Sequence, residues 1–308
     1  MTGETIPERA YDRTATNRAI LLMTASAALF GLMAFAAKVA SARLSGPQVA
    51  MIRFAIHLLP VLIIPTYRRA AARFDRLDLL LYRGFFGGVA VLLYFVAIAH
   101  IDVGIATLLN YTSPIFSGFL SMMFLRERIS PKVLIPMPLA LIGVFLVVHA
   151  HARPGDILGF GRWEMVGLLS AISSGAAVTA MRAARQTENS WSVYASFCVL
   201  GLLTCLPQGL SSWKTPLPSE WVALAFMSLF AIGAQLLLTF SLRWLDALTV
   251  GVISQLAVLV SMALGATLLR EMIVPMAAIG SALAISGVIG VVFVTSVNKR
   301  PVDAAVVD

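Results

Sequence analysis

The sequence predicts an all-α integral membrane protein with ten transmembrane helices, arranged as two inverted five-helix repeats with the N- and C-termini in the cytoplasm. Three observations predict this fold class. The 308-residue chain is 59% hydrophobic and only 12% charged, which is too few charges to cover a soluble surface. Its apolar residues form ten long stretches, and its second half repeats the first at a fixed shift.

The ten apolar stretches appear when the chain is divided at polar or turn-forming clusters, and each approaches the ~20 residues that a spanning helix needs. They lie at about 19–42, 48–67, 79–99, 103–125, 132–150, 163–184, 191–210, 220–242, 247–269 and 275–297. The polar residues 1–18 precede an apolar run that is too long for a signal peptide. We therefore expect cytoplasmic tails at 1–18 and 298–308, a first repeat at 19–150 and a second at 163–297.

An internal repeat relates the two halves, because residues 91–148 align without a gap on residues 235–292. Identical pairs include Asp102 with Asp246 (246 − 102 = 144), Leu125-Arg126-Glu127 with Leu269-Arg270-Glu271, and Gly31 with Gly175. A match of this extent indicates a duplicated structural unit. With five spans per copy, equivalent helices cross the bilayer in opposite directions, as in secondary transporters that bind substrate near the midplane.

The basic residues predict the orientation. With a cytoplasmic N-terminus, 16 of the 23 Lys and Arg residues lie on the inside and 5 on the outside, while Lys38 and Arg53 lie within helices. This asymmetry favours both termini inside the cell, in a bacterial inner membrane. The net charge of +8 is spread over short loops, so we expect no nucleic-acid partner.

Several features narrow the class of protein. No loop is long enough for a soluble catalytic or ATP-binding domain, and the phosphate-loop, zinc-protease and nucleophile-elbow motifs are missing from the sequence. Cys198 and Cys205 lie roughly 10 Å apart along one helix, beyond disulfide reach, and we expect them to be buried. An intramembrane enzyme would need paired carboxylates, a metal cluster or an activated nucleophile within the membrane. We expect no enzymatic activity, cofactor, metal or ATP.

Residues 30–60 and 94–130 resemble the EamA domain of the drug/metabolite transporter (DMT) superfamily. The motifs that carry this resemblance are Gly31 and Lys38, Arg53-Phe54, Pro114, Leu125 and Glu127. The second copy has Phe197 at the Arg position and Val258 at the Pro position. The resemblance covers nearly all of residues 18–297 and implies a metabolite transporter, similar to the YddG-type exporters of aromatic and other neutral amino acids.

Four polar residues predict a substrate site near the midplane. Asn110 and Tyr111 lie about 12 Å from the outer end of their helix at 1.5 Å per residue, and Ser254 and Gln255 are their repeat equivalents. Polar side chains at this depth must face protein or water. Pro114 bends the helix and exposes backbone carbonyls to a cavity. The alternative is that these groups only form hydrogen bonds between helices.

Arg53 and His57 lie four residues apart and therefore on one helix face. We assign Arg53 a structural role as a clamp on helix-end carbonyls, with contact to a substrate carboxylate as the alternative. His57 is a candidate substrate-binding residue, with an interhelical hydrogen bond as the alternative. Lys38 lines the outer vestibule or extends to the membrane surface. Glu127 and Glu271 are assigned structural roles.

Further candidates complete the expected site. Tyr94, Gln235 and Ser174 are candidate lining residues, and Trp163 is assigned to the interfacial aromatic belt. Gly31, Gly175, Gly87 and Gly88 allow close helix approach, and we interpret them as hinges, with packing alone as the alternative.

The absence of carboxylates from the helix centres indicates facilitated or weakly coupled transport, since all 15 acidic residues lie in tails, loops or helix ends. His57 is the one midplane residue suited to titration near neutral pH. The predicted function is export of a small amino-acid-like metabolite across the lipid bilayer. The alternatives are transport of a nucleoside, a drug-like amphiphile or a sugar phosphate, and, from another class, an intramembrane enzyme.

Overall fold

The computed structural model describes residues 13–125, 132, 135–150, 161–184, 187–241, 247–272 and 274–297. Every secondary-structure element assigned within these residues is a helix. In chain order these are α1 (Arg13–Ala40), α2 (Gly46–Ile63), α3 (Pro65–Ala71), α4 (Leu77–His100), α5 (Val103–Asn110), α6 (Ser113–Leu125), α7 (Pro136–His149), α8 (Arg162–Ala184), α9 (Ser190–Ser211), α10 (Pro218–Ser241), α11 (Ala247–Ser254), α12 (Leu256–Leu268) and α13 (Pro275–Val297).

Seven segments within the described residues are long and apolar enough to cross a membrane. Three more, Pro136–His149, Val252–Leu268 and Pro275–Gly290, are apolar but shorter. All of them fall within or close to the predicted apolar stretches. The predicted class of an all-helical membrane protein is therefore confirmed.

The second predicted helix, 48–67, is divided in two. Pro65 disfavours the helical conformation for the residue before it, and Ile64 is accordingly extended, with φ −93° and ψ 111°. Pro65 then begins the short helix α3, where its missing N–H is harmless. The sequence analysis did not anticipate α3.

Two predicted helices, 103–125 and 247–269, are each interrupted near the middle. In the first, Pro114 cannot donate to a carbonyl one turn earlier, and the chain closes instead with a tight bond from Thr112 N to Leu109 O (3.2 Å). The second copy has no proline, yet Gln255 N likewise bonds to Val252 O (3.1 Å). Tyr111 and Gln255 occupy equivalent positions (255 − 111 = 144), so both repeats break at the same point. The prediction of a continuous helix over 247–269 was wrong.

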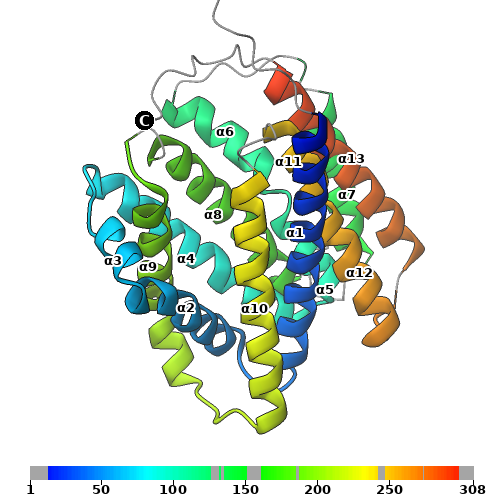
Figure 1. The fold of residues 1–308 in the computed structure, drawn as a ribbon. Coiled ribbons are helices and arrows are strands. Elements are labelled where there is room, and N and C mark those ends of the chain that lie inside the picture. Colours follow the sequence, from blue (N-terminus) through cyan, green and yellow to red (C-terminus); the bar gives the residue numbers. More distant parts are fainter. Residues whose placement is uncertain are drawn as a thin grey trace, which may run out of the picture.

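The helices pack in pairs that follow the repeat. Helix α1 packs against α10, and its counterpart α8 packs against α4, which corresponds to α10. The equivalent helices α2 and α9 pack against each other, as do α7 and α13. The Ser45 hydroxyl, at the start of α2, bonds to the Ser212 hydroxyl just after α9 (2.6 Å), so α2 and α9 run antiparallel. The start of α1 and the end of α13 lie at the same end of the bundle (Figure 1).

Small residues allow α4 to approach α9 and α7 to approach α13 closely. A Cβ atom at Gly88 in α4 would meet the backbone of Gly201 in α9, and one at Gly143 in α7 would meet the backbone of α13 near Ala284. Contacts of this kind replace the hydrophobic effect as the force that holds helices together in lipid.

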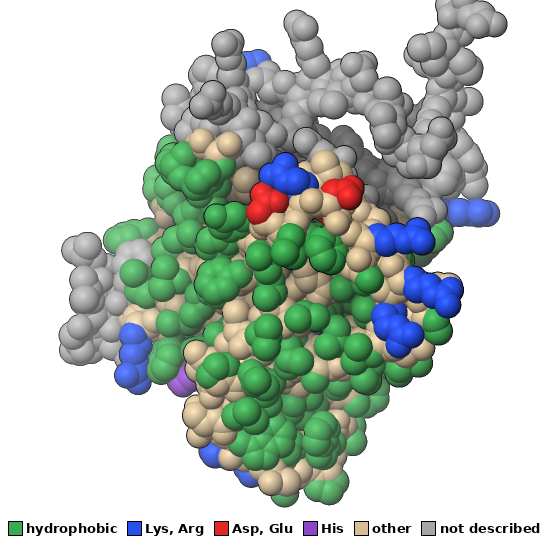
Figure 2. All heavy atoms as spheres, turned by 90° about the vertical axis from the view of Figure 1, so that its left-hand side faces the viewer, with side chains coloured by type: hydrophobic (Ala, Val, Ile, Leu, Met, Phe, Trp, Pro, Cys, Tyr) green, Lys and Arg blue, Asp and Glu red, His purple; other side chains and the backbone are tan. Residues whose placement is uncertain are grey.

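Large apolar side chains cover much of the outer surface, as expected for a protein surrounded by lipid. Figure 2 shows them over the middle of one face, with charged side chains toward its ends. Ile63 and Leu229, for example, are 70% and 62% exposed. The largest core cluster joins α1, α2, α4, the start of α5, α9 and α10, and includes Phe54, Phe95 and Met227. The helices that carry Arg53, His57 and Tyr94 are thus held by one core.

Candidate functional site

Six buried polar atoms have no hydrogen-bond partner among the described residues; two are Ser41 Oγ and Arg83 Nε, and the other four lie on α2, on α10 and at the break between α11 and α12. These four are Arg53 Nε, His57 Nε2, Ser228 Oγ and Gln255 Nε2. Their residues are 7%, 2%, 1% and 3% exposed. An unpaired buried polar group costs about 1–3 kcal/mol, so a group of them indicates a place where another molecule forms hydrogen bonds.

Arg53 lies on α2, about 10 Å from its first residue at 1.5 Å per residue. Its guanidinium Cζ is 5.7 Å from the Phe54 ring centre and 5.6 Å from the Phe95 ring centre. No carboxylate of the described residues lies within ion-pair distance of it. Placing an arginine at this depth in a membrane costs about 3 kcal/mol of insertion free energy. Cation–π contacts with the two rings offset only part of that cost. Bonds from Arg53 to helix-end carbonyls, the clamp predicted for it, do not occur within the described residues.

His57 occupies the same face of α2, one turn from Arg53. The Tyr194 hydroxyl of α9 donates to the His57 carbonyl (3.0 Å), and the His57 ring lies beside the Ser228 backbone of α10. The sequence analysis missed Tyr194 and Ser228. Both are polar residues in the interior of apolar helices, which was the available signal.

Tyr94 of α4 reaches toward α5. Its hydroxyl lies 2.9 Å from the Thr107 hydroxyl, which itself donates to Val103 O (2.7 Å). The Tyr94 ring packs edge-on against Phe95, one of the two rings beside Arg53. Tyr94 therefore connects the first half of the broken helix to the arginine.

The two helix breaks present different groups. The Asn110 side chain donates to Ser170 Oγ of α8 (3.1 Å), and Ser254 Oγ donates to Val250 O in its own helix (2.7 Å). These two residues thus already have partners. Tyr111 is partly buried, while the buried Gln255 amide nitrogen is unpaired. Of the two pairs, Tyr111 and Gln255 are better placed to contact a substrate.

The remaining candidate lining residues lie farther along the neighbouring helices. Ser174 of α8 and Gln235 of α10 are both partly buried. The predicted hinges Gly31 and Gly175 occupy equivalent contacts, since a Cβ at Gly31 would meet Val260 of α12 and one at Gly175 would meet Phe116 of α6.

On α4, Gly87 lies against Phe197 of α9 and Gly88 against Gly201. These contacts are consistent with close packing, and their role as hinges stays a prediction. Cys198 and Cys205 are both buried and free, as expected. Trp163 stacks on the His100 ring, with centroids 3.5 Å apart.

Lys38 and Glu271 meet at the far end of α1. Lys38 Nζ donates to Ile101 O (2.7 Å), and both Glu271 carboxylate oxygens accept from Val103 N, at 3.0 and 3.1 Å. Glu271 thereby caps the N-terminus of α5, where a negative charge is favourable. Burial is the main influence on the carboxyl of Glu271 and raises its pKa. Glu127, its repeat equivalent, lies outside the described residues.

The backbone at the end of α12 positions Glu271. Arg270 has a left-handed φ of 57°, and Leu269 N and Glu271 N both bond to Gly265 O (3.1 Å each). This helix-ending turn directs the chain back over α12. The carboxylate then reaches α5 from a segment far away in the sequence.

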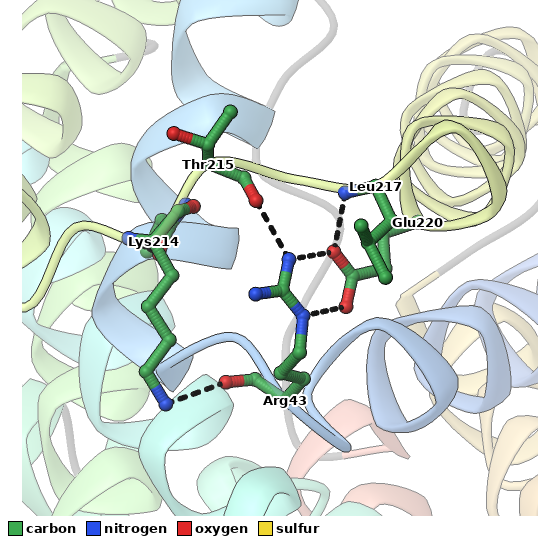
Figure 3. A network of polar contacts seen from close by, with 6 residues as sticks. Arg43, Lys214, Thr215, Leu217 and Glu220 are labelled. Carbon is green, nitrogen blue, oxygen red and sulfur yellow. Dashed lines mark hydrogen bonds and ion pairs between the residues drawn. The ribbon is translucent and has the colours of Figure 1, made fainter.

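At the same end of the bundle, the turn between α1 and α2 is joined to the loop after α9. Arg43 forms a bidentate ion pair with Glu220 (2.6 and 2.7 Å) and donates to Thr215 O (2.6 Å), as Figure 3 shows. The Gln48 side chain bonds to both the N–H and the C=O of Lys214 (3.1 and 2.6 Å). We refer to Arg43, Gln48, Lys214, Thr215 and Glu220 as the first latch.

The other end of the α2–α9 pair carries a counterpart. Asn189, which caps α9, donates to Ala70 O and Arg73 O (3.0 Å each). The Ser192 hydroxyl contacts the same two carbonyls (3.2 and 2.6 Å), and Ser192 is the repeat equivalent of Gln48. We refer to Asn189, Ser192, Ala70 and Arg73 as the second latch.

A pocket of about 460 Å³ opens beside the first latch. It is lined by Ser41, Arg43, Gly46, His100, Gln208 and Lys214, among others. Its walls are the ends of α2, α4 and α9, the helices that carry Arg53, Tyr94 and Tyr194 deeper in the bundle. The pocket therefore lies at the mouth of the same helix group.

Comparison with known proteins agrees with this architecture. The model of the EamA-like transporter family matches twice, at residues 17–149 and 161–293. The two matches start 144 residues apart (161 − 17), the shift of the internal repeat. The predicted resemblance to the EamA domain is confirmed at the level of the family.

Similar proteins include several transporters. The pseudopaline exporter CntI of Pseudomonas aeruginosa (strain UCBPP-PA14) is 28% identical over 221 residues, 71% of this chain and 76% of that protein. Human solute carrier family 35 member G1 is 25% identical over 210 residues, 64% of this chain and 57% of that protein. A crystal structure with 20% identity superposes with a TM-score of 0.58, covering 91% of this chain and 98% of the other, and shows likeness of fold alone.

Proposed function

Since the chain belongs to the EamA-like transporter family, we propose that it is a secondary transporter that exports amino acids or closely similar small metabolites by alternating access. The observation that carries this proposal is the group of unpaired buried polar atoms on α2, α10 and the break between α11 and α12. Broken helices at the midplane are how secondary transporters expose polar groups to a substrate.

We propose a topology of ten crossings, with two inverted repeats at 19–150 and 163–297 and both termini in the cytoplasm of a bacterial cell. The antiparallel contact between the equivalent helices α2 and α9 supports the inversion. The positions of the first and last described residues at one end of the bundle support a common side for the termini (Figure 1). The first latch and the pocket then face the outside.

Two features support an amino-acid-like substrate. Arg53 is a buried cation without a carboxylate partner among the described residues, and the rings around it suit an apolar or aromatic side chain. A sugar phosphate would require several cationic side chains around one group. Arg53 lies beside Phe54 and Phe95, whereas Arg83, the other arginine with a buried, unpaired Nε among the described residues, lies against Phe197. The similarity to a pseudopaline exporter also favours outward transport of a metabolite.

Counterflow tests the proposed function. Purified protein in liposomes preloaded with unlabelled phenylalanine should transiently accumulate labelled phenylalanine added outside, and liposomes without protein should not. Preloading with alanine, uridine and glucose 6-phosphate in parallel compares the substrate classes. Exchange of uridine or glucose 6-phosphate, with no exchange of either amino acid, would reject the amino-acid assignment.

Cysteine labelling tests the topology. In a background that lacks Cys198 and Cys205, single cysteines at Ser45 and Lys214 should react with an impermeant reagent added to sealed cells. A cysteine at Gln186 should react only after the cells are opened. Labelling of Gln186 in sealed cells would reverse the proposed orientation.

A further inference from the structure

Arg53 differs in its surroundings from the arginines that pair with carboxylates, and, like Arg83, it has a buried, unpaired Nε. Arg53 is 93% buried (7% exposed), Nε has no hydrogen-bond partner, and the guanidinium lies near two aromatic rings. Arg43 and Arg76, by contrast, form bidentate bonds to carboxylates near the ends of helices. A buried guanidinium keeps its charge, so this cation is left without the anion that normally accompanies it.

The groups around Arg53 are donors and rings. Tyr94 and Tyr194 come within electrostatic range of the guanidinium from α4 and α9. The unpaired Nε2 of His57 lies on the same face of α2. The Tyr94 hydroxyl is bonded to Thr107 and the Tyr194 hydroxyl to the His57 carbonyl. The groups left to meet an anionic oxygen are therefore the guanidinium and, as an N–H, His57 Nε2. The described residues place no carboxylate there that could pair with an ammonium group.

We propose that Arg53 is the group that binds the carboxylate of the transported substrate, and that the carboxylate, not the amino group, is what the site recognises. This inference rests on the proposed transport function and extends it to the substrate class: carboxylates with an apolar or aromatic body. The planar guanidinium matches a carboxylate with two parallel hydrogen bonds. Phe54 and Phe95 lie beside the guanidinium, so an apolar or aromatic substrate body would meet apolar surface next to the bound carboxylate.

The proposal makes an amino group dispensable and a carboxylate essential. Among molecules of similar size and ring content, 3-phenylpropanoate should bind, phenylalanine should bind, and phenethylamine and phenylalaninamide should not. Arg53 is buried in this conformation, so a ligand reaches it only after the helices around it separate. Binding should therefore be measured at equilibrium, after incubation.

The test is a thermal-shift series on the purified full chain with these four compounds. The two carboxylates should raise the unfolding midpoint of the wild type, and the amine and the amide should leave it unchanged. In Arg53→Gln the carboxylate-dependent rise should disappear. Arg83→Gln is the matched control, because Arg83 also contacts a ring, Phe197, at 4.4 Å and has a buried unpaired Nε. It should keep the difference between acid and amine.

Arg53→Lys keeps the positive charge but removes the planar guanidinium, so it separates the effects of the two. It also provides the test if Arg53→Gln does not fold. Arg53→Lys should bind 3-phenylpropanoate about tenfold more weakly than the wild type, as expected when a bidentate bond becomes a single one. Stabilisation of the wild type by phenethylamine but not by the acids would overturn the proposal. So would an unchanged response in Arg53→Gln or Arg53→Lys.

Counterflow distinguishes failure of this inference from failure of the proposed function. If phenylalanine and phenylalaninamide exchange equally well, the protein is a transporter but the carboxylate is not the recognised group. If the acids raise the unfolding midpoint but neither exchanges, Arg53 binds carboxylates and the transport assignment is what fails.

Discussion

In the first repeat, α2 carries Arg53 and His57 on one face, whereas the equivalent positions of α9 in the second repeat are Phe197 and Gly201. Tyr94 of α4 likewise corresponds to Leu238 of α10. Apart from α3, which has no separate counterpart, the helices themselves correspond one to one, and both repeats break their fourth helix at the same position. The duplication has preserved the scaffold, while the polar residues of the site differ between the repeats: Arg53, His57 and Tyr94 lie in the first, and Ser228 and Gln255 lie in the second.

The second repeat provides the space in which Phe54 of the first repeat packs. A Cβ at Gly201 would collide with the Phe54 ring, which is completely buried, and Phe197 packs edge-on against Phe54 with centroids 5.1 Å apart. Phe54 is one of the rings beside Arg53. The absence of a side chain at Gly201 therefore fixes the ring that orients the arginine, and the two repeats make complementary contributions to one site.

One end of the bundle carries two contacts between the repeats. Helix α5 packs against α12, and Glu271 caps α5, at the end that holds the first latch. Glu127, the counterpart of Glu271, lies outside the described residues. At this end the two repeats are therefore joined by both the Glu271 cap and the first latch.

The largest expected effect is on transport, and it distinguishes the helix break at Gln255 from the break near Asn110. Gln255→Leu removes an unpaired midplane donor, and we expect transport to fall about 10- to 100-fold, as for a lost bond of about 1–3 kcal/mol to substrate. Asn110→Leu removes a bond to Ser170 and should mainly lower the unfolding midpoint. Counterflow and thermal unfolding are measured on both variants. Normal transport by Gln255→Leu at normal expression would mean that Gln255 serves helix packing only.

A second prediction tests the packing role of the second repeat. Gly201→Ala should destabilise the protein by about 1–3 kcal/mol, because the buried Phe54 ring must shift to accept the methyl group. Gly118→Ala in α6 is the matched control, since nothing lies within 4 Å of a Cβ there. It should be neutral or stabilising by up to about 1 kcal/mol. Equal unfolding midpoints for the two variants would remove Gly201 from the account of the site.

The sequence predicted the features that depend on local composition and on the repeat. The spans and the ends of most helices follow from the lengths of the apolar stretches. The break near Pro114 follows from the missing N–H of proline. No proline follows Gln255 to indicate the break there. The sequence could have predicted this break only by applying the repeat shift to the break at Tyr111. Glu271 was recognised as a structural residue, but its contact with Val103 joins residues far apart in the sequence and depends on the turn at Arg270.

The central site was only partly predictable for the same reason. His57, Tyr94 and Gln255 stood out as polar residues in apolar helices. Whether each was paired could not be read from the sequence, because pairing depends on helices that contact one another only in the fold. Asn110, for example, is bonded to Ser170. Arg53 was assigned a clamp on helix-end carbonyls, and the described residues contain no such bond.

A third prediction compares the two latches. Gln48→Ala removes both bonds to Lys214 and should weaken the first latch by about 1–2 kcal/mol. A cysteine at Ser41, which lines the pocket, should then react several-fold faster with an impermeant reagent added outside. Ser192→Ala weakens the second latch instead and should leave that rate unchanged or lower. Equal acceleration in both variants would show general loosening rather than opening at one end.

The smallest expected effect concerns energy coupling, for which the repeats again differ, because His57 has Gly201 as its counterpart and no acidic residue lies at a helix centre. In proteoliposomes the wild type should equilibrate its substrate without an imposed proton gradient, and a gradient should not drive uphill accumulation unless His57 carries the proton. His57→Gln keeps hydrogen-bonding capacity but cannot titrate near neutral pH. We expect its equilibration rate to lie within a few-fold of the wild type.

The gradient experiment on the two proteins separates three mechanisms. No accumulation in either indicates facilitated export. Accumulation in the wild type that disappears in His57→Gln assigns the proton to His57 and places the coupling residue on α2, one turn from Arg53. Accumulation that persists in His57→Gln contradicts the facilitated mechanism, and coupling then depends on another group, such as the Glu271 carboxyl, whose pKa burial raises.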